Sequence, residues 1–251
     1  MLLSGAGRLR QAARSAGVAL ATILLAAPLA LAAAAPQTDP LGAELAAGRP
    51  QTLVCYGTSL TAAREGWVAQ SHALLKQRHG DLITIVNAAK GGENSTWGLA
   101  QLEGRVLVHR PDVVTIEFAM NDAARKSALT VAGARRNLET LIARLRAANP
   151  ATRIILLTMN PLGAAVLARP AEHPFSRAEL DAHYAMVREV AAEQGLVLVD
   201  HHAAWLRLRA ESPELFDRHV PDGVHPDPEI SRRLILPAML RAFGVAPVEP
   251  E

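Results

Sequence analysis

Cysteine is almost missing from this 251-residue chain: Cys55 is the only one, which excludes an internal disulfide. It lies in an apolar segment, so we expect a small core residue rather than a reactive thiol, which needs an accessible, electropositive setting. Internal repeats and low-complexity tracts are missing from residue 51 onwards. With 50% hydrophobic and 20% charged residues, the chain is expected to form one globular domain with a sizeable core and short appendages.

An excess of either charge is also missing once the first 35 residues are set aside. Those residues hold three of the 26 lysines and arginines and no acid, which leaves 23 basic against 24 acidic side chains. Nucleic acids and anionic membranes are bound by clustered positive charge. A near-neutral remainder therefore predicts no nucleic-acid partner and no attraction to an anionic membrane.

The N-terminus has the layout of a secretory signal peptide. Three arginines precede an alanine-rich apolar run over residues 16–31, and small residues follow at 32–35. We expect a signal peptide over residues 1–34, cut after Ala34, and a secreted or periplasmic protein without stable membrane association after cleavage. No adjacent arginine pair precedes the run, which favours the general secretory route. A retained membrane anchor is the alternative, since the run approaches spanning length.

The rest of the chain divides into a linker, a folded domain and a tail. Residues 35–50 hold three prolines and little periodicity, so a linker is expected there. The folded domain is expected over residues 51–245 and the tail over 246–251. Apolar runs predict strands at 52–56, 82–86, 113–118, 154–158 and 196–199. Helices are predicted near 65–79, 96–107, 138–145, 177–194, 202–209 and 229–243, with Pro237 kinking or ending the last one.

Strands that alternate with helices predict an α/β fold. The apolar runs are continuous rather than alternating, as expected for strands covered on both faces. We therefore expect a three-layer α/β/α sandwich around a five-stranded parallel sheet with the flavodoxin-like strand order 2-1-3-4-5. In that order the second and third strands flank the first, so the loops that follow all three strands meet at one edge of the sheet.

Residues suited to acyl transfer follow these strands. Ser59 stands after the first strand in a turn opened by a glycine, where a serine can be a nucleophile or a helix cap. Far downstream, His225 can act as its base and Asp222 can hold the imidazole in one tautomer. Donors for a developing oxyanion are the backbone N–H groups of Ser59 and Gly92 and the side-chain amide of Asn121.

Four motifs in this order resemble the GDSL/SGNH hydrolase superfamily, over roughly residues 51–245. They are Gly57-Thr58-Ser59-Leu60-Thr61, the segment from Asn87 to Asn94, Ala119-Met120-Asn121-Asp122, and Asp222 to His225 with the proline that follows. The resemblance implies a serine esterase without a cofactor or metal. In it Ser59, His225 and Asp222 form the catalytic triad, and Ser59, Gly92 and Asn121 form the oxyanion hole.

Two positions depart from the family pattern. Thr58 stands where an aspartate usually precedes the serine, which is not one of the catalytic groups. Ala119 stands where the third motif usually has a glycine, so a shift of the backbone that carries Asn121 is expected. Gly91 adjoins Gly92, and either glycine can be the oxyanion donor.

The resemblance implies carboxylic esters as substrates, either O-acetyl groups of a polysaccharide or short-chain acyl esters. The alternatives are a lysophospholipase or thioesterase of the same fold, and a carbohydrate-binding module that has lost turnover. Residues 160–177, with His173 and Phe175, are expected to form a pocket wall. Asp200-His201-His202 has metal-binding residue types, but Asp200 lies between a strand and a helix, so a helix cap is favoured over a metal site.

Overall fold

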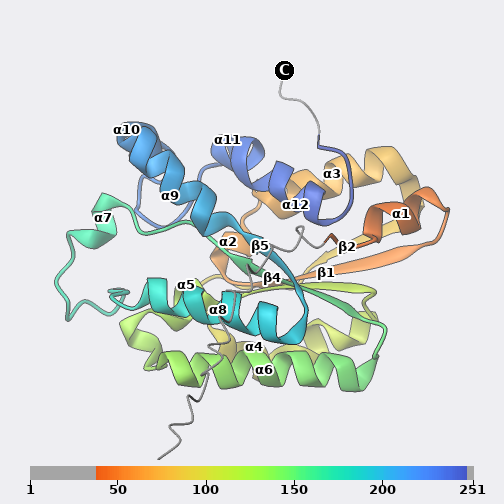
Figure 1. Cartoon of the computed structure of the whole chain (residues 1–251), viewed down its shortest axis with the longest axis horizontal. Helices are drawn as coiled ribbons and strands as arrows, with labels where there is room; N and C mark the ends of the chain where they lie inside the picture. The colour runs from red at the N-terminus through yellow and green to blue at the C-terminus, as the bar shows by residue number, and fades with distance from the viewer. Residues whose placement is uncertain (1–37, 248–251) are drawn as a thin grey trace, which may run out of the picture. The chain divides into compact units, whose positions relative to one another are not determined.

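A five-stranded parallel sheet organises the computed structural model, which describes residues 38–247 (Figure 1). The strand order is β2-β1-β3-β4-β5, which confirms the predicted fold. The strands are β1 (Gln51–Gly57), β2 (Ile83–Asn87), β3 (Val113–Glu117), β4 (Arg153–Thr158) and β5 (Val197–Asp200). The predicted signal peptide lies outside the described residues.

Helices cover both faces of this sheet (Figure 1). One face carries α4 (Ser95–Arg105), α6 (Val131–Ala148) and α8 (Leu180–Gln194), which pack side by side. The other face carries α3 (Trp67–His79) and α12 (Leu236–Ala242) in contact with each other. Helices α9 (His201–Glu211) and α10 (Pro213–His219) follow β5. None of the helices within residues 38–247 has both the length and the apolar character that crossing a bilayer requires.

Short helical segments complete the described chain. Their bounds are α1 (Leu41–Ala46), α2 (Ser59–Ala62), η1 (Gly80–Leu82), η2 (Leu107–His109), α5 (Ala119–Asp122), η3 (Arg125–Ser127), α7 (Ala164–Leu167), α11 (Pro228–Ile230) and η4 (Ser231–Ile235). The last of these is a π-helical turn. Two of the others, α2 and α5, follow directly after β1 and β3, so they set the direction of the side chains at the sheet edge.

The core lies on both sides of β3, the central strand, and of its neighbour β1. Every residue of β3 is buried, and Leu53, Val54 and Cys55 of β1 have no exposed surface. Burial on both faces explains why their sequences are continuously apolar. Cys55 is the small core residue that was predicted, and burial raises the pKa of its thiol to about 12.

Two local predictions differ from the structure. The linker predicted over 35–50 contains α1, whose Leu41 and Leu45 are buried and whose Gly42 N–H donates to the Phe243 carbonyl. A six-residue helix is too short to show periodicity, so the prediction of an irregular segment there was wrong. The helix predicted over 229–243 is not one regular α-helix. The π-helical turn η4 ends at Ile235 and passes directly into α12, with Pro237 in the first turn of α12. This interruption beside Pro237 agrees with the predicted distortion, because proline lacks the N–H that a regular helix needs.

Candidate active site

Ser59 lies at the carboxyl end of β1, where the strand passes into α2. Thr58 is the N-cap of α2, and its side-chain oxygen accepts from the Leu60 N–H at 3.2 Å. A Cβ on Gly57 would come within 2.5 Å of the Glu117 carbonyl oxygen and 2.8 Å of Thr61 Oγ1. Only glycine therefore fits at the end of the strand, and the tight turn presents Ser59 at the sheet edge.

The structure brings His225 and Asp222 to Ser59 across 166 residues of sequence. Ser59 Oγ is 2.8 Å from His225 Nε2, and His225 Nδ1 is 2.5 Å from Asp222 Oδ2. The other carboxylate oxygen of Asp222 accepts from the backbone N–H groups of Val224 and His225. These contacts form one continuous chain from hydroxyl to imidazole to carboxylate.

Hydrogen bonding keeps the Asp222 carboxylate charged. Burial raises its pKa, but the bonds from the His225 ring and from two backbone N–H groups outweigh burial and leave the pKa below its usual value. The side chains of His225 and Asp222 are 49% and 51% exposed. The imidazole therefore faces an anion at neutral pH while one side of the site stays open to solvent.

The loop that carries Asp222 and His225 is tied to the segment after β4. Gly223 has a φ of 78°, in the left-handed region, and its carbonyl accepts from the Gly163 N–H at 2.9 Å. The side-chain amide of Asn160 donates to the Val224 carbonyl at 2.9 Å. Asn160 is fully buried, so the loop rests on a rigid part of the core.

The two other predicted oxyanion residues lie on adjoining segments. Gly92 has a φ of 81°, and a Cβ on Gly91 would come within 3.6 Å of Ser59 Cβ. Asn121 lies in α5 after β3, and its Nδ2 donates to the Glu93 carbonyl at 2.8 Å. The glycine turn therefore lies against Ser59 and is joined to the segment that carries Asn121.

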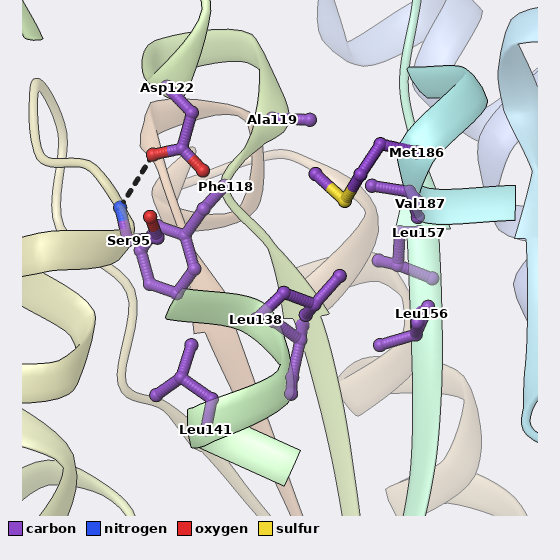
Figure 2. A pocket seen from close by; sticks show the side chains of 11 residues that line it. Ser95, Phe118, Ala119, Asp122, Leu138, Leu141, Leu156, Leu157, Met186 and Val187 are labelled. Carbon is purple, nitrogen blue, oxygen red and sulfur yellow. Dashed lines mark hydrogen bonds between the residues drawn. The ribbon is translucent and has the colours of Figure 1, made fainter. Parts of the chain in front are cut away.

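A second bond joins the same two segments, shown in Figure 2. Asp122 accepts from the Ser95 N–H at 2.7 Å, and burial raises the pKa of this carboxyl to about 6. Ala119 has no left-handed φ and lines the void beneath α5. Its Cβ is therefore accommodated in the helical turn. The void, of about 10 Å³, is lined mainly by core leucines and other apolar side chains, and it is too small for a substrate.

A different small cavity opens directly beside Ser59 and His225. Its volume is about 20 Å³, room for about one water molecule or methyl group. The wall is mainly apolar and is formed by Leu60, Ala63, Gly66, Pro226, Ser231 and Ile235. It carries no charged side chain apart from the titratable His225.

The segment predicted as a pocket wall lies on the other flank, beside the glycine turn. Phe175 is 39% exposed, and Lys126 Nζ lies 4.4 Å from the centroid of its ring. The same ammonium is 3.5 Å from the Gly92 carbonyl oxygen. A cation and an aromatic face thus border the site next to the predicted oxyanion donors.

Residues 41–233 match the GDSL-like lipase/acylhydrolase family. The chain belongs to this family. Esterase TesA of Pseudomonas aeruginosa is 31% identical over 119 residues, which cover 44% of this chain and 56% of that protein. The match therefore spans little more than half the length of that relative.

Solved structures share the fold of this GDSL-family chain. A catalytic mutant of Axe2, an acetylxylan esterase from Geobacillus stearothermophilus, superposes with a TM-score of 0.65 at 23% identity, covering 81% of this chain and 98% of that one. LAE5, an alpha/beta hydrolase enzyme from the metagenome of Lake Arreo, superposes with a TM-score of 0.60 at 24% identity, covering 78% and 96%. At these identities the likeness shows a shared fold and nothing finer.

Sequence reasoning missed Glu117, which lies behind the serine turn of this GDSL-family site. Glu117 is 2% exposed, and its Oε2 accepts from the Thr58 N–H, the Thr58 hydroxyl and the Thr61 hydroxyl at 3.1, 2.7 and 3.2 Å. Burial raises the pKa of its carboxyl to about 7. An acid in an otherwise apolar strand was the available signal.

Three further residues near the site were missed. His219 Nδ1 lies 2.8 Å from Asp227 Oδ2, and Asp227 Oδ1 accepts from the Ile230 N–H. This pair closes the far end of the loop that carries His225. Arg177, at the end of the predicted wall segment, is buried and donates to Asn121. Neither contact follows from spacing in the sequence, because each depends on how separate loops pack.

The residues considered for a metal are engaged otherwise. The Asp200 carboxylate pairs with the Arg188 guanidinium at 2.8 Å and accepts from the Thr158 hydroxyl at 2.7 Å. Asp200 stands at the N-cap position of α9, and hydrogen bonds from Arg188, Thr158 and the Ala203 N–H outweigh burial and lower the pKa of its carboxyl. Burial lowers the pKa of His201 to about 4. Across residues 38–247, no three His, Cys, Asp or Glu side chains group as metal ligands.

Proposed function

We propose that this GDSL-family chain hydrolyses carboxylic esters through Ser59, His225 and Asp222. The observation that carries the proposal is the chain of contacts from Ser59 Oγ to His225 Nε2 at 2.8 Å and from His225 Nδ1 to Asp222 Oδ2 at 2.5 Å. Hydroxyl, imidazole and carboxylate stand in the order that nucleophilic acyl transfer needs.

In the first half-reaction, Ser59 Oγ bonds to the ester carbonyl carbon while His225 Nε2 takes the hydroxyl proton. Asp222 holds the Nδ1–H and stabilises the imidazolium that forms. The carbonyl π electrons move to oxygen, which becomes an oxyanion. When the intermediate collapses, the bond to the alcohol oxygen breaks and His225 gives its proton to that oxygen. An alcohol leaves and an acyl-enzyme remains.

In the second half-reaction, a water molecule attacks the acyl carbon as His225 Nε2 takes its proton. Collapse breaks the bond to Ser59 Oγ, which recovers the proton from His225, and a carboxylic acid leaves. We assign the oxyanion hole to the N–H groups of Ser59 and Gly92 and the Asn121 amide. Asn121 donates one of its two amide hydrogens to Glu93, and the other is available for the oxyanion.

We propose a small acyl group, such as an acetyl, on the substrate. Support comes from the cavity beside Ser59 and His225, which at about 20 Å³ has room for a methyl group. The larger alcohol part, a sugar of a polysaccharide or a simple alcohol, leaves towards solvent on the exposed side of His225. A panel of acetylated xylan, short p-nitrophenyl esters and lysophosphatidylcholine tests this. Preference for lysophosphatidylcholine would assign the lysophospholipase alternative instead.

We further propose that the protein acts outside the cytoplasm, as a secreted or periplasmic enzyme released from its leader. The sequence of residues 1–35, with arginines before an apolar run and small residues after it, supports this. The near-neutral charge of the rest fits an uncharged ester better than nucleic acid.

Labelling with an organophosphonate, followed by peptide mapping, tests the mechanism. We expect the phosphonyl group on Ser59, since only an activated serine reacts readily. Ser59→Ala should lose both labelling and turnover while it stays folded. Ser71→Ala, which removes a buried hydroxyl on α3 away from His225, is the control and should keep both. Hydrolysis retained by Ser59→Ala would identify the wrong nucleophile, and absence of labelling would favour a binding module.

A further inference from the structure

Arg177 is a buried cation on the oxyanion side of the site. Arg177 is only 6% exposed, although its side chain carries a full positive charge. Nε donates to the Met120 carbonyl at 2.8 Å, and Nη1 donates to the Phe175 carbonyl at 3.0 Å. Nη2 donates to Asn121 Oδ1 at 3.4 Å. Its acceptors are thus two carbonyls and an amide oxygen, and a guanidinium held by such partners costs more to bury than one paired with a carboxylate.

Two of these bonds act on the segment that carries the oxyanion amide. Met120 directly precedes Asn121, so the bond to its carbonyl holds the peptide from which the asparagine projects. A guanidinium can only donate, so Nη2 requires the oxygen of the Asn121 side chain to face it. The amide nitrogen then faces the Glu93 carbonyl, to which it donates at 2.8 Å. Rotation of the amide by 180° would set its N–H groups against the guanidinium N–H of Arg177. It would also set its carbonyl oxygen against the Glu93 carbonyl.

We propose that Arg177 is a positioning residue that fixes the orientation of the Asn121 amide, so that one N–H points to the oxyanion before substrate binds. This inference rests on the proposed role of Asn121. Donors fixed in advance stabilise a transition state without the cost of reorientation. Arg177 touches neither the nucleophile nor the substrate carbonyl in this arrangement, and it acts through Asn121.

The segment that carries Arg177 is also held in place by bonds of its own backbone. The backbone of that segment is bonded independently to the chain after α5. The Arg125 N–H donates to the Ser176 carbonyl at 2.9 Å, and the Lys126 N–H donates to the Pro174 carbonyl at 2.8 Å. These backbone bonds do not involve the Arg177 side chain. Its replacement removes the bonds to the Met120 and Phe175 carbonyls and to Asn121 Oδ1.

Arg177→Met keeps much of the apolar volume and removes the donors. We expect kcat for an activated acetyl ester to fall about 10- to 100-fold, with KM changed less than about threefold. The loss is smaller than the roughly 10²- to 10³-fold that follows complete removal of a donor. Arg144→Met is the matched control, because Arg144 also donates to a backbone carbonyl, that of Leu99, but lies on α6. It should leave kcat unchanged. An unchanged kcat in Arg177→Met would overturn the proposal.

A double variant separates positioning from a general structural effect. If Arg177 acts through Asn121, its replacement costs less than about twofold once Asn121→Ala has removed the amide, because effects within one unit are not additive. A further loss of tenfold or more in the double variant would overturn the proposal. Arg177→Lys keeps the charge but not the planar fork. It should remain within about threefold of Arg177→Met, and full recovery would show that charge alone matters.

One readout does not depend on turnover. The Asn121 side-chain amide gives a ¹⁵N–¹H resonance that Asn121→Ala identifies by its disappearance. We expect this resonance to shift in Arg177→Met and to stay in place in Arg144→Met. A resonance that does not move in Arg177→Met would overturn the positioning role. If the wild-type protein hydrolyses no ester, the proposed function fails, and this measurement still decides whether Arg177 orients the amide.

Discussion

At the scale of single residues, the environment of Glu117 explains how a buried carboxyl is tolerated behind the serine turn. Thr58 stands where the family usually has an aspartate, and its hydroxyl donates to Glu117 at 2.7 Å. An aspartate there would have brought a second acid against a buried one. The threonine supplies a donor, caps α2 and joins the serine turn to the end of β3.

Glu117→Gln tests the protonation of this carboxyl. Its pKa is raised by burial from a usual 4.5 to about 7, so the folded state holds a proton that the unfolded state releases between these values. The stabilisation is therefore full below pH 4.5 and is lost as the pH rises through 7. Relative to Glu117→Gln, the wild-type free energy of unfolding should fall by about 3 kcal/mol over this range, measured by denaturant unfolding.

The control for this measurement is Glu139→Gln, on the partly exposed surface of α6, where Glu139 pairs with Arg135. Its difference from wild type should change little between pH 4.5 and 7, since an exposed ion pair contributes little. A pH-independent difference between wild type and Glu117→Gln would show that the Glu117 carboxyl keeps an ordinary pKa.

At the scale of elements, the short loop between α10 and α11 controls the site, because it carries both Asp222 and His225. A chain turn within three residues is possible there only with a left-handed residue, and Gly223 provides it with a φ of 78°. The loop packs so closely on α7 that a Cβ on Gly223 would come within 2.8 Å of Val166 Cγ2 and of the Val166 backbone nitrogen. Conformation and packing both require glycine.

Gly223→Ala should therefore displace the loop. We expect a loss of about 1–3 kcal/mol in the free energy of unfolding and a fall in kcat/KM of at least about tenfold, because misplacing the base by a fraction of an ångström is costly. Gly80→Ala is the control: its φ is also positive, at 57°, but nothing lies near the new Cβ. It should cost about 1–3 kcal/mol in the free energy of unfolding, because alanine is strained at a positive φ, with unchanged kcat/KM. Equal activity of both variants would contradict the role of the loop.

At the scale of the whole molecule, the charge of the Asp222 carboxylate bears on the acid limb of the pH–rate profile. The pKa of Asp222 lies below its usual value, because hydrogen bonds from His225 and two backbone N–H groups outweigh burial, so Asp222 is charged throughout the assay range. A protonated base cannot take the Ser59 proton, so activity is expected to rise with pH. We expect kcat/KM for a p-nitrophenyl acetate-type ester to rise with a slope of about one and reach a plateau. A flat profile, with chemistry limiting, would exclude a histidine base.

The proposed export is tested on the whole chain. We expect a bacterial host to release a product that begins at Ala35, since the small residues Ala32 and Ala34 fit the pattern of a cleavage site. Intact-mass measurement of the released protein checks this. Ala34→Arg should block cleavage, because the recognition site needs a small residue there. A product that keeps residues 1–34 would indicate a retained anchor.

Much of the fold and half of the site followed from the sequence alone, because both rest on local patterns. Continuous apolar runs separated by helical segments determined a parallel sheet with helices on both faces. A glycine turn after β1 and the spacing of Asp222 and His225 determined which side chains could meet. These signals are local, since strand periodicity, turn chemistry and short motifs depend on neighbouring residues.

Only the tertiary structure decided the rest. That α1 packs on the C-terminal segment, that Thr58 donates to Glu117 and that Arg177 faces Asn121 depend on contacts between residues about 56 or more positions apart. The small cavity beside Ser59 likewise forms from α2, the His225 loop and η4. Such contacts arise when separately specified elements pack against one another. No local pattern records them, because side-chain packing selects the partner only after the chain has folded.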